Sequence, residues 1–279
     1  MSLFEVYSIG FEEDHRLRSI LVREVMLRQL GEATSRTLPS VTVIAKNLVR
    51  YWDDHTEIPQ DVKVCLDSWS PLLDEGFSLL LFDKQSALDY IADKFTNKEV
   101  EAFARCRHPA MQSDFFRMCY LLIEGGLYVD ADDILLGDGW KRIFGNGRLK
   151  LQPLCYDTLT SRMVPVLDFL TAGRSSDQQI FYVNNDPIAA PAGHPILAKA
   201  LARSTARLLG DDHLPQIQET TGPGNITAVL ASHACELIAK GKEIDFDLLF
   251  DWDSIAEMRW DLSYRSDARN WRNVDGSGF

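Results

Sequence analysis

Residues 111–136, MQSDFFRMCYLLIEGGLYVDADDILL, constrain the fold of this chain more than any other stretch. From Asp114 the apolar residues recur at helical spacing, which predicts a helix with Ser113 as its N-cap. Gly125-Gly126 then ends the helix and lets the chain fold back sharply. The stretch therefore predicts a helix and a following segment that lie side by side.

That following segment predicts a short strand, residues 127–129, that runs directly into Asp130, Asp132 and Asp133. Residues two apart on a strand point to the same side, so two carboxylates there repel each other unless they are solvated, protonated or bridged by a cation. A hard divalent ion such as Mg²⁺ or Mn²⁺ suits oxygen ligands of this kind. On these acids alone, a solvated acidic turn and a metal site are equally good interpretations.

The rest of the chain alternates strand and helix patterns, which favours an α/β fold with an open sheet. Ligands bind at the carboxyl ends of strands in such sheets, where the acids lie. We expect an N-terminal helical extension in residues 1–40 and a single domain in residues 41–279. The predicted helices span residues 12–30, 62–69, 86–95, 100–106 and 195–209, and the other predicted strands span residues 41–49, 77–82 and 180–183.

Asp114 and Arg117 are three residues apart and therefore face the same way on the predicted helix. An Arg/Asp pair beside metal-binding carboxylates suits a polyhydroxylated, phosphorylated ligand. The alternative is an ordinary intrahelical ion pair, which contributes only about 0.3–0.5 kcal/mol.

The spacing in this region resembles that of the DXD-containing sugar transferases of glycosyltransferase family 32. The stretches that resemble the family extend from about residue 41 to residue 271. They comprise Ser113-Asp114, Arg117, Leu121, Gly125-Gly126, Tyr128, Asp130 and Asp132, then Arg50-Tyr51-Trp52, Ile58-Pro59 and Cys65-Leu66-Asp67-Ser68-Trp69, and finally Gly193-His194-Pro195 and Thr221-Gly222-Pro223-Gly224.

The resemblance implies a GT-A type fold with an open twisted mixed sheet, and transfer of a hexose from a UDP- or GDP-hexose with retention of configuration. It also implies a metal site, in which Asp132 binds Mn²⁺ or Mg²⁺ and Asp130 contacts the metal, its water shell or the ribose. Where the family closes its site with a loop that carries a histidine or an acid before a tryptophan, residues 266–271 hold no histidine. Asp267 and Asn270 are the candidates for a further metal contact.

The resemblance implies donor contacts as well. Asp114 and Arg117 would hold the sugar hydroxyls and place the diphosphate, and both count with the two acids as catalytic candidates. Trp52 would stack on the nucleobase, Tyr128 would join the donor site, and Trp271 would cover it. Without the resemblance, Trp52 is better interpreted as a core aromatic.

Composition limits the partners. A formal net charge of -12 argues against nucleic acid or an anionic membrane surface, since both need clustered Lys and Arg. The five cysteines form no CxxC pair, and neither a signal peptide nor a membrane-spanning segment is evident, so we expect reduced thiols and a cytoplasmic protein.

The expected function is metal-dependent hexosyl transfer to a hydroxyl of a glycan, polysaccharide or protein, with Asp186 as a candidate for acceptor contact. One alternative is a phosphotransferase with an aspartyl nucleophile, whose site also begins with a hydrophobic strand and DxD, although 129 residues precede Asp130 here. The other is a sugar-nucleotide-binding module that has lost turnover.

Overall fold

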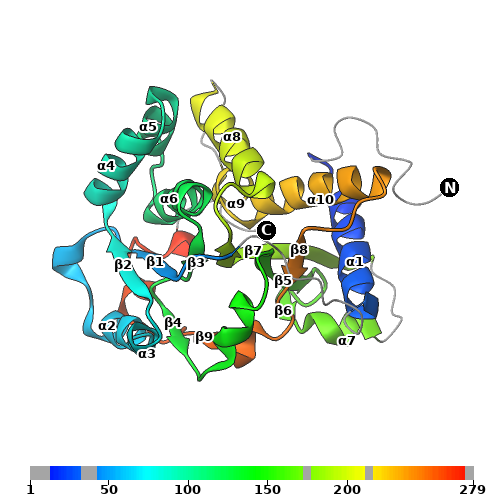
Figure 1. Cartoon of the computed structure of the whole chain (residues 1–279), viewed down its shortest axis with the longest axis horizontal. Helices are drawn as coiled ribbons and strands as arrows, with labels where there is room; N and C mark the ends of the chain where they lie inside the picture. The colour runs from blue at the N-terminus through cyan, green and yellow to red at the C-terminus, as the bar shows by residue number, and fades with distance from the viewer. Residues whose placement is uncertain (1–12, 33–42, 172–176, 211–215, 274–279) are drawn as a thin grey trace.

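The computed structural model describes residues 13–32, 43–171, 177–210 and 216–273, and a central sheet runs through it (Figure 1). Seven described strands form this sheet: β1 (Asn47–Tyr51), β2 (Ser78–Phe82), β3 (Gly126–Tyr128), β5 (Leu149–Asp157), β6 (Arg162–Val164), β7 (Gln179–Ala190) and β8 (Phe246–Leu248). Two further strands, β4 (Asp133–Leu135) and β9 (Ala256–Met258), pair with each other in a separate antiparallel sheet.

The large sheet is open and mixed. Its order is β2-β1-β3-β7-β5-β6, and β8 pairs with β5. β1 runs parallel to β2 and β3, whereas β7 is antiparallel to β3 and β5. The predicted α/β class, with an open mixed sheet, flanking helices and an N-terminal helix, is confirmed, and its GT-A type stays a prediction.

Helices cover both faces of the sheet (Figure 1). Above it in that view lie α4 (Lys84–Lys94), α5 (Asn97–Ala104), α6 (Pro109–Ile123), α8 (Pro195–Leu209), α9 (Ile217–Thr220) and α10 (Pro223–Ala239). Below it lie α2 (Gln60–Asp67), α3 (Pro71–Asp74) and α7 (Val166–Thr171), and α1 (His15–Glu32) stands at one side. No described helix is both long and apolar enough to cross a bilayer.

The turn between α6 and β3 requires its two glycines. Gly125 has φ 67° and Gly126 has φ 121°, and residues other than glycine rarely adopt such positive φ angles. A Cβ at Gly126 would also lie 2.6 Å from the carbonyl oxygen of Asn47 in β1. The helix therefore folds back onto the following strand, as the sequence predicted, and the structure places that strand directly beside β1.

Three predicted element boundaries are wrong, and two of them lie near the acids. α6 begins at Pro109 with His108 as its N-cap, whose Nδ1 accepts from the Ala110 N–H at 3.0 Å, so Ser113 lies inside the helix. The strand predicted to end at residue 183 continues through Asn184-Asn185-Asp186 to Ala190. The first strand begins at Asn47 rather than residue 41, and residues 41 and 42 lie outside the described residues.

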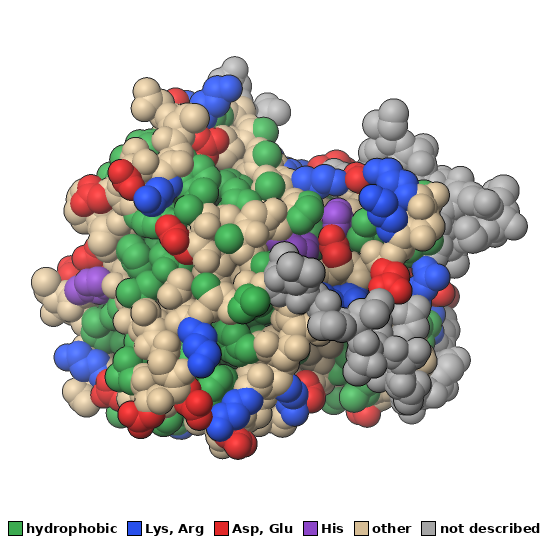
Figure 2. Space-filling model, in the orientation of Figure 1, with side chains coloured by type: hydrophobic (Ala, Val, Ile, Leu, Met, Phe, Trp, Pro, Cys, Tyr) green, Lys and Arg blue, Asp and Glu red, His purple; other side chains and the backbone are tan. Residues whose placement is uncertain are grey.

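Most apolar burial lies in two clusters, one on each side of the sheet. The larger includes Phe115 and Phe116 of α6, and the smaller includes Trp69 and Trp252, whose rings stack with centroids 6.4 Å apart. Charged side chains of both signs are interspersed on the described part of the face in Figure 2. Exposed ion pairs contribute only about 0–1 kcal/mol each, so the free energy of folding comes mainly from the two clusters.

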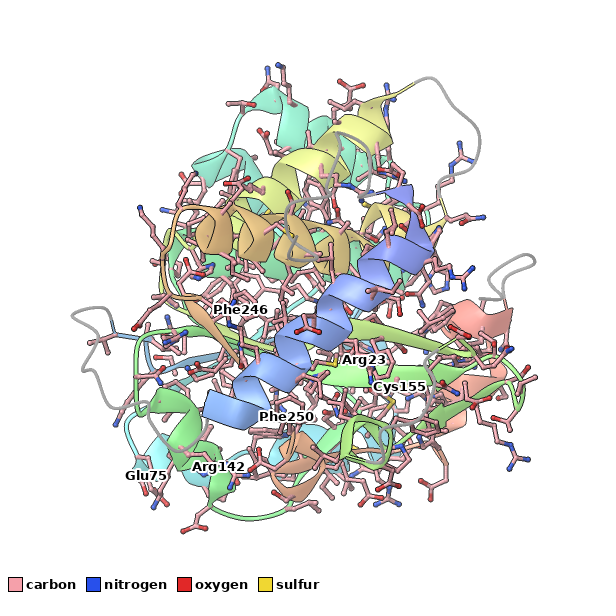
Figure 3. All side chains as sticks on the ribbon, turned by 90° about the vertical axis from the view of Figure 1, so that its right-hand side faces the viewer. Arg23, Glu75, Arg142, Cys155, Phe246 and Phe250 are labelled. Carbon is pink, nitrogen blue, oxygen red and sulfur yellow. The ribbon has the colours of Figure 1, made fainter. Side chains whose placement is uncertain are left out.

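Helix α1 is bound to the sheet by hydrogen bonds as well as by packing, and Figure 3 shows it crossing in front of the sheet. The Gln29 amide donates to the Phe246 carbonyl oxygen at 3.0 Å, and the Leu248 N–H donates to the Gln29 Oε1 at 2.9 Å. These bonds satisfy backbone groups of β8. The predicted division into an N-terminal extension, residues 1–40, and a domain, residues 41–279, stays a prediction. Four apolar residues of α1 belong to the larger cluster: Leu21, Val22, Val25 and Met26.

Candidate functional site

The acids of the predicted site lie in the turn that joins β3 to β4. Tyr128 is the last residue of β3 and Asp133 the first of β4, so Asp130 and Asp132 are not on one continuous strand. Because β1 and β3 are parallel, their carboxyl ends meet at one edge of the sheet, and Trp52 follows β1 there. The topology, rather than strand alternation, gathers these residues.

Asp130 is held by three contacts and keeps one oxygen free. Its Oδ1 accepts from Arg117 Nη2 at 2.8 Å and from the Tyr128 hydroxyl at 3.0 Å. Its backbone N–H donates to Asp186 Oδ1 at 2.9 Å. Within the described part of the chain no group donates to its Oδ2, and the side chain is 31% exposed. Oδ2 is therefore available to a ligand.

Arg117 is the centre of the buried polar network. Its side chain is 3% exposed, and its Nη2 lies 3.1 Å from Asp114 Oδ1 and 2.9 Å from Ser113 Oγ. Its guanidinium carbon lies 4.1 Å from the centroid of the Tyr128 ring. Burial is the largest single effect and opposes the charge, but Asp130 and the other acidic neighbours together outweigh it and raise the pKa of Arg117. The guanidinium therefore stays charged, and the predicted pairing of Asp114 with Arg117 is present in the structure.

Asp114 joins α6 to two later parts of the chain. Asn185, in the middle of β7, donates its amide to Asp114 Oδ1 at 2.7 Å. Thr221, in the turn before α10, donates its hydroxyl to Asp114 Oδ2 at 3.2 Å. Burial raises the pKa of Asp114 to about 6, against the lowering effect of Arg117.

Asp186 carries a buried oxygen to which no described group donates a hydrogen bond. Its Oδ1 accepts from the Asp130 N–H, but its Oδ2 has no hydrogen-bond partner among the described residues. Burial, and then the charge of Asp130, raise the pKa of Asp186 well above its usual range. Leaving such an atom unpaired is unfavourable, so this edge of the site has unused capacity to accept a hydrogen bond or a cation.

Asp132 is covered by the C-terminal segment, residues 259–273. Tyr264 donates its hydroxyl to Asp132 Oδ2 at 2.6 Å, and Arg265 Nη2 donates to the same oxygen. The Asp132 side chain is 9% exposed. Burial and the neighbouring Asp130 raise the pKa of Asp132, and Arg265 opposes them. A side chain of this segment thus places a positive charge on the acid predicted to bind a metal.

Trp52 is 6% exposed and belongs to a third, small apolar cluster, separate from the two large ones. The Tyr264 ring stands perpendicular to it with centroids 5.3 Å apart, and the Arg269 guanidinium carbon lies 5.6 Å from its centroid. Its Nε1 donates to the Glu57 carbonyl oxygen at 3.3 Å. The C-terminal segment therefore contacts both Asp132 and the tryptophan predicted to stack on a base.

The other candidates of this segment do not contact the acids. Asp267 Oδ1 accepts from the Arg269 N–H at 2.7 Å, and the Asn270 amide donates to the Arg265 carbonyl oxygen at 2.7 Å. Trp271 lies beside Arg272, whose guanidinium carbon is 4.6 Å from its centroid. Asp267 and Asn270 hold the segment in shape, and no contact places either beside Asp130 or Asp132.

Residues 59–144 match the model of a protein family described as "Glycosyltransferase sugar-binding region containing DXD motif". The chain is a glycosyltransferase with a DXD sugar-binding region. None of the curated proteins matches it.

Among solved structures, the chain is similar to "PaToxG Glycosyltransferase", with 17% identity, a TM-score of 0.49 and coverage of 82% of each chain. Neither the fold described above nor the function rests on this likeness.

The matched region of this glycosyltransferase includes Asp114, Arg117, Tyr128, Asp130 and Asp132. Its activity class is nucleotide-sugar dependent transfer, and proteins with a DXD region generally use a divalent metal. Trp52, Asn185, Thr221 and the C-terminal segment lie outside the match, so only the contacts described above connect them to the site.

The residues present fit a cation that is shared with a ligand better than one held by protein alone. The free Oδ2 of Asp130, the Asp132 carboxylate and the unpaired Asp186 Oδ2 are all oxygen donors. In the described ranges no three His, Cys, Asp or Glu side chains are arranged to hold a metal by themselves. Mg²⁺ typically takes one or two carboxylates and completes its shell with water and phosphate.

Sequence reasoning missed four residues that make the site. Asn185 and Thr221 hold Asp114, and Tyr264 and Arg265 cap Asp132. The first two had a signal, because Thr221 belongs to the Thr221-Gly222-Pro223-Gly224 stretch that resembles the family and Asn185 directly precedes Asp186, the candidate for acceptor contact. The last two had none, since they are 132 and 133 residues beyond Asp132.

Proposed function

We propose that this glycosyltransferase moves a hexose from UDP-hexose or GDP-hexose to a hydroxyl of a glycan, polysaccharide or protein, with a divalent metal and with retention of configuration. The observation that carries the proposal is the buried network of Asp114, Arg117 and Asp130 beside Asp132. A buried arginine with carboxylates at one open edge suits a ligand with both hydroxyls and phosphates.

Each member of the network has a proposed role. Asp114 and Arg117 bind the sugar hydroxyls and orient the anomeric carbon, and Tyr128 fixes both Arg117 and Asp130. The free Oδ2 of Asp130 binds the ribose or a water of the metal. Asp132 would hold Mn²⁺ or Mg²⁺, which supplies positive charge against the diphosphate when bound.

Trp52 and Trp271 complete the proposed donor site. Trp52 stacks on the base once Tyr264 and Arg269 move from its ring, and stacking of this kind contributes about 1–3 kcal/mol. Trp271 covers the donor. Asp186, whose Oδ2 has no described partner, accepts a hydrogen bond from the acceptor.

The proposed reaction breaks the bond between the anomeric carbon and the diphosphate oxygen and forms a bond to the acceptor oxygen. The diphosphate leaves with the bonding electrons and takes the proton of the acceptor hydroxyl. In this scheme the acceptor attacks from the face that the diphosphate leaves, so no side chain acts as a nucleophile. Arg117 holds its charge in the buried site and stabilises the negative charge that develops.

The decisive experiment measures release of sugar from UDP- and GDP-hexoses, with EDTA and after adding back Mn²⁺, in wild type and Asp132→Asn. We expect turnover that EDTA removes, and a loss of about a hundredfold or more in Asp132→Asn. Asp138→Asn, an exposed acid in a nearby loop, is the matched control and should behave as wild type. Full turnover in EDTA, or an active Asp132→Asn, would falsify the metal role.

One observation favours the alternative of a nucleotide-sugar-binding module without turnover: Arg265 occupies the Asp132 carboxylate. The same assay separates the two, since that module would bind UDP or GDP and release no sugar. Cytoplasmic residence remains part of the proposal, supported by five cysteines that form no disulfide.

A further inference from the structure

The C-terminal segment, residues 259–273, carries four arginines and only two acids, in a chain of formal net charge -12. Three of the arginines are paired with carboxylates. Arg272 is the exception, because no described carboxylate forms an ion pair with it. The three pairs are Arg259 with Asp261 at 3.1 Å, Arg269 with Glu57 at 3.1 Å, and Arg265 with Asp132.

Arg265 and Arg272 meet at one exposed aromatic ring. Trp260 is 58% exposed, and the two guanidinium carbons lie 4.7 and 4.6 Å from its centroid. Partial desolvation and the charge of Arg265 lower the pKa of Arg272. Two like charges held at one ring repel each other, so together they favour an anion between or beside them.

The donors of Arg265 are only partly used. Its Nη2 donates to Asp132 and lies 3.2 Å from the Arg259 carbonyl oxygen. Its Nε is buried and has no hydrogen-bond partner among the described residues. A guanidinium presents five N–H donors in a planar fork, and a buried one that is unpaired is unfavourable. This group therefore has capacity for a further acceptor.

We propose that Arg265 and Arg272 form the anion-binding half of the donor site and bind the diphosphate of the nucleotide sugar, and that Arg265 leaves Asp132 as the divalent metal arrives. The inference rests on the proposed function and names residues outside the matched DXD region.

Two anions could bind the arginine pair, the diphosphate or an acidic group of the acceptor, and the position of Arg265 favours the diphosphate. Arg265 contacts the acid that would hold the metal, and in the proposed site the diphosphate lies on that same metal. A second cation on one carboxylate is repelled, whereas the diphosphate attracts both the metal and the guanidinium. Arginine also matches phosphate oxygens with two parallel hydrogen bonds.

Arg265 and Arg272 also act in the proposed reaction. When the bond between the anomeric carbon and the diphosphate oxygen breaks, its electron pair stays on the diphosphate. Two guanidinium groups placed there stabilise that charge, and the acceptor proton neutralises part of it. Until a donor binds, Arg265 neutralises Asp132 in a site with several carboxylates.

The test measures binding rather than turnover. Calorimetry gives the affinity for UDP, GDP, the matching monophosphate and the nucleoside, in wild type, Arg265→Gln and Arg272→Gln. We expect each variant to lose about tenfold or more in affinity for the diphosphate and much less for the monophosphate. A titration of Mn²⁺ alone, followed by electron paramagnetic resonance, should show tighter Mn²⁺ binding in Arg265→Gln because Asp132 is released.

The controls separate the possible failures. Arg259→Gln, on the same segment but paired with exposed Asp261, should bind the diphosphate as wild type does. Arg265→Lys keeps a charge on Asp132 and should fold if Arg265→Gln does not, while still losing diphosphate affinity. Wild-type diphosphate affinity in Arg272→Gln and the Arg265 variants would overturn this inference alone, as would a change only in affinity for an acidic acceptor. A wild type that binds neither UDP nor GDP would overturn the proposed function as well.

Discussion

At the scale of single residues, this site is held together by charges that the protein has taken out of water. Arg117 is 3% exposed and contacts Asp114 and Asp130, so its removal leaves two carboxylates without their counter-charge. Removing one partner of a buried pair is far more unfavourable than removing a surface pair. The proposed donor site and the stability of the fold therefore depend on the same side chain.

We expect Arg117→Met to lower the free energy of unfolding by about 3–5 kcal/mol and to abolish donor binding. Lys240→Met is the matched control, because Lys240 pairs with Glu236 at 3.8 Å on the surface, and its effect should stay below about 1 kcal/mol. Urea unfolding, followed by circular dichroism, measures the unfolding free energy of both variants. Equal midpoints for Arg117→Met and wild type would show that the network contributes nothing to stability.

Asp114 should give the protein a recognisable pH dependence. Its pKa is about 6 in the fold because of burial and lies near 3.8 in the unfolded chain. Between these values the native state binds more protons, so this group's contribution to stability is present at low pH and is lost as pH rises through about 6. From pH 4 to pH 7, the unfolding free energy of wild type should therefore fall by up to about 3 kcal/mol relative to that of Asp114→Asn. Parallel curves would contradict this assignment.

At the scale of elements, the sequence correctly predicted those helices, turns and strands that depend on local sequence patterns. The helix, the glycine pair and the strand of residues 111–129 follow from spacing and backbone freedom, and all are present. The start of α6 was placed too late because Pro109 and His108 form a better N-terminus than Ser113. Ser113 instead contacts the Tyr128 hydroxyl at 2.6 Å inside the fold.

β7 shows why the rest could not be predicted. Asn184-Asn185-Asp186 has the composition of a turn, yet it lies within a strand because its side chains find buried partners. Asn185 bonds to Asp114 and Asp186 to the Asp130 N–H, both contributed by distant segments. Only the assembled sheet supplies those partners.

The glycine turn gives the clearest test at this scale. We expect Gly126→Ala to destabilise the protein by several kcal/mol, because the added Cβ would lie 2.6 Å from the Asn47 carbonyl oxygen at a φ of 121°. Gly137→Ala is the matched control, since nothing lies within 4 Å of its added Cβ. Thermal unfolding compares the two. A Gly126→Ala variant as stable as Gly137→Ala would mean that β3 can move away from β1.

At the scale of the whole molecule, segments far apart in sequence complete the site. Tyr264 and Arg265 reach Asp132 from the other end of the domain, and Arg18 of α1 pairs with Glu219 of α9 at 2.9 Å. Glu219 lies two residues before Thr221, which holds Asp114. The N-terminal helix thus supports the turn that fixes a proposed sugar-binding residue.

This arrangement predicts that α1 cannot be removed as a separate extension. Its four buried apolar side chains, each at most 1% exposed, stabilise the fold by roughly 6–12 kcal/mol at about 1.5–3 kcal/mol per side chain. A domain of this kind has only about 5–15 kcal/mol of net stability. A chain that begins at residue 41 should therefore show no cooperative thermal transition, whereas one that begins at residue 13 and keeps α1 should unfold as the full chain does. A cooperative transition and intact UDP or GDP binding in the shorter chain would establish residues 41–279 as a domain that folds without the helix.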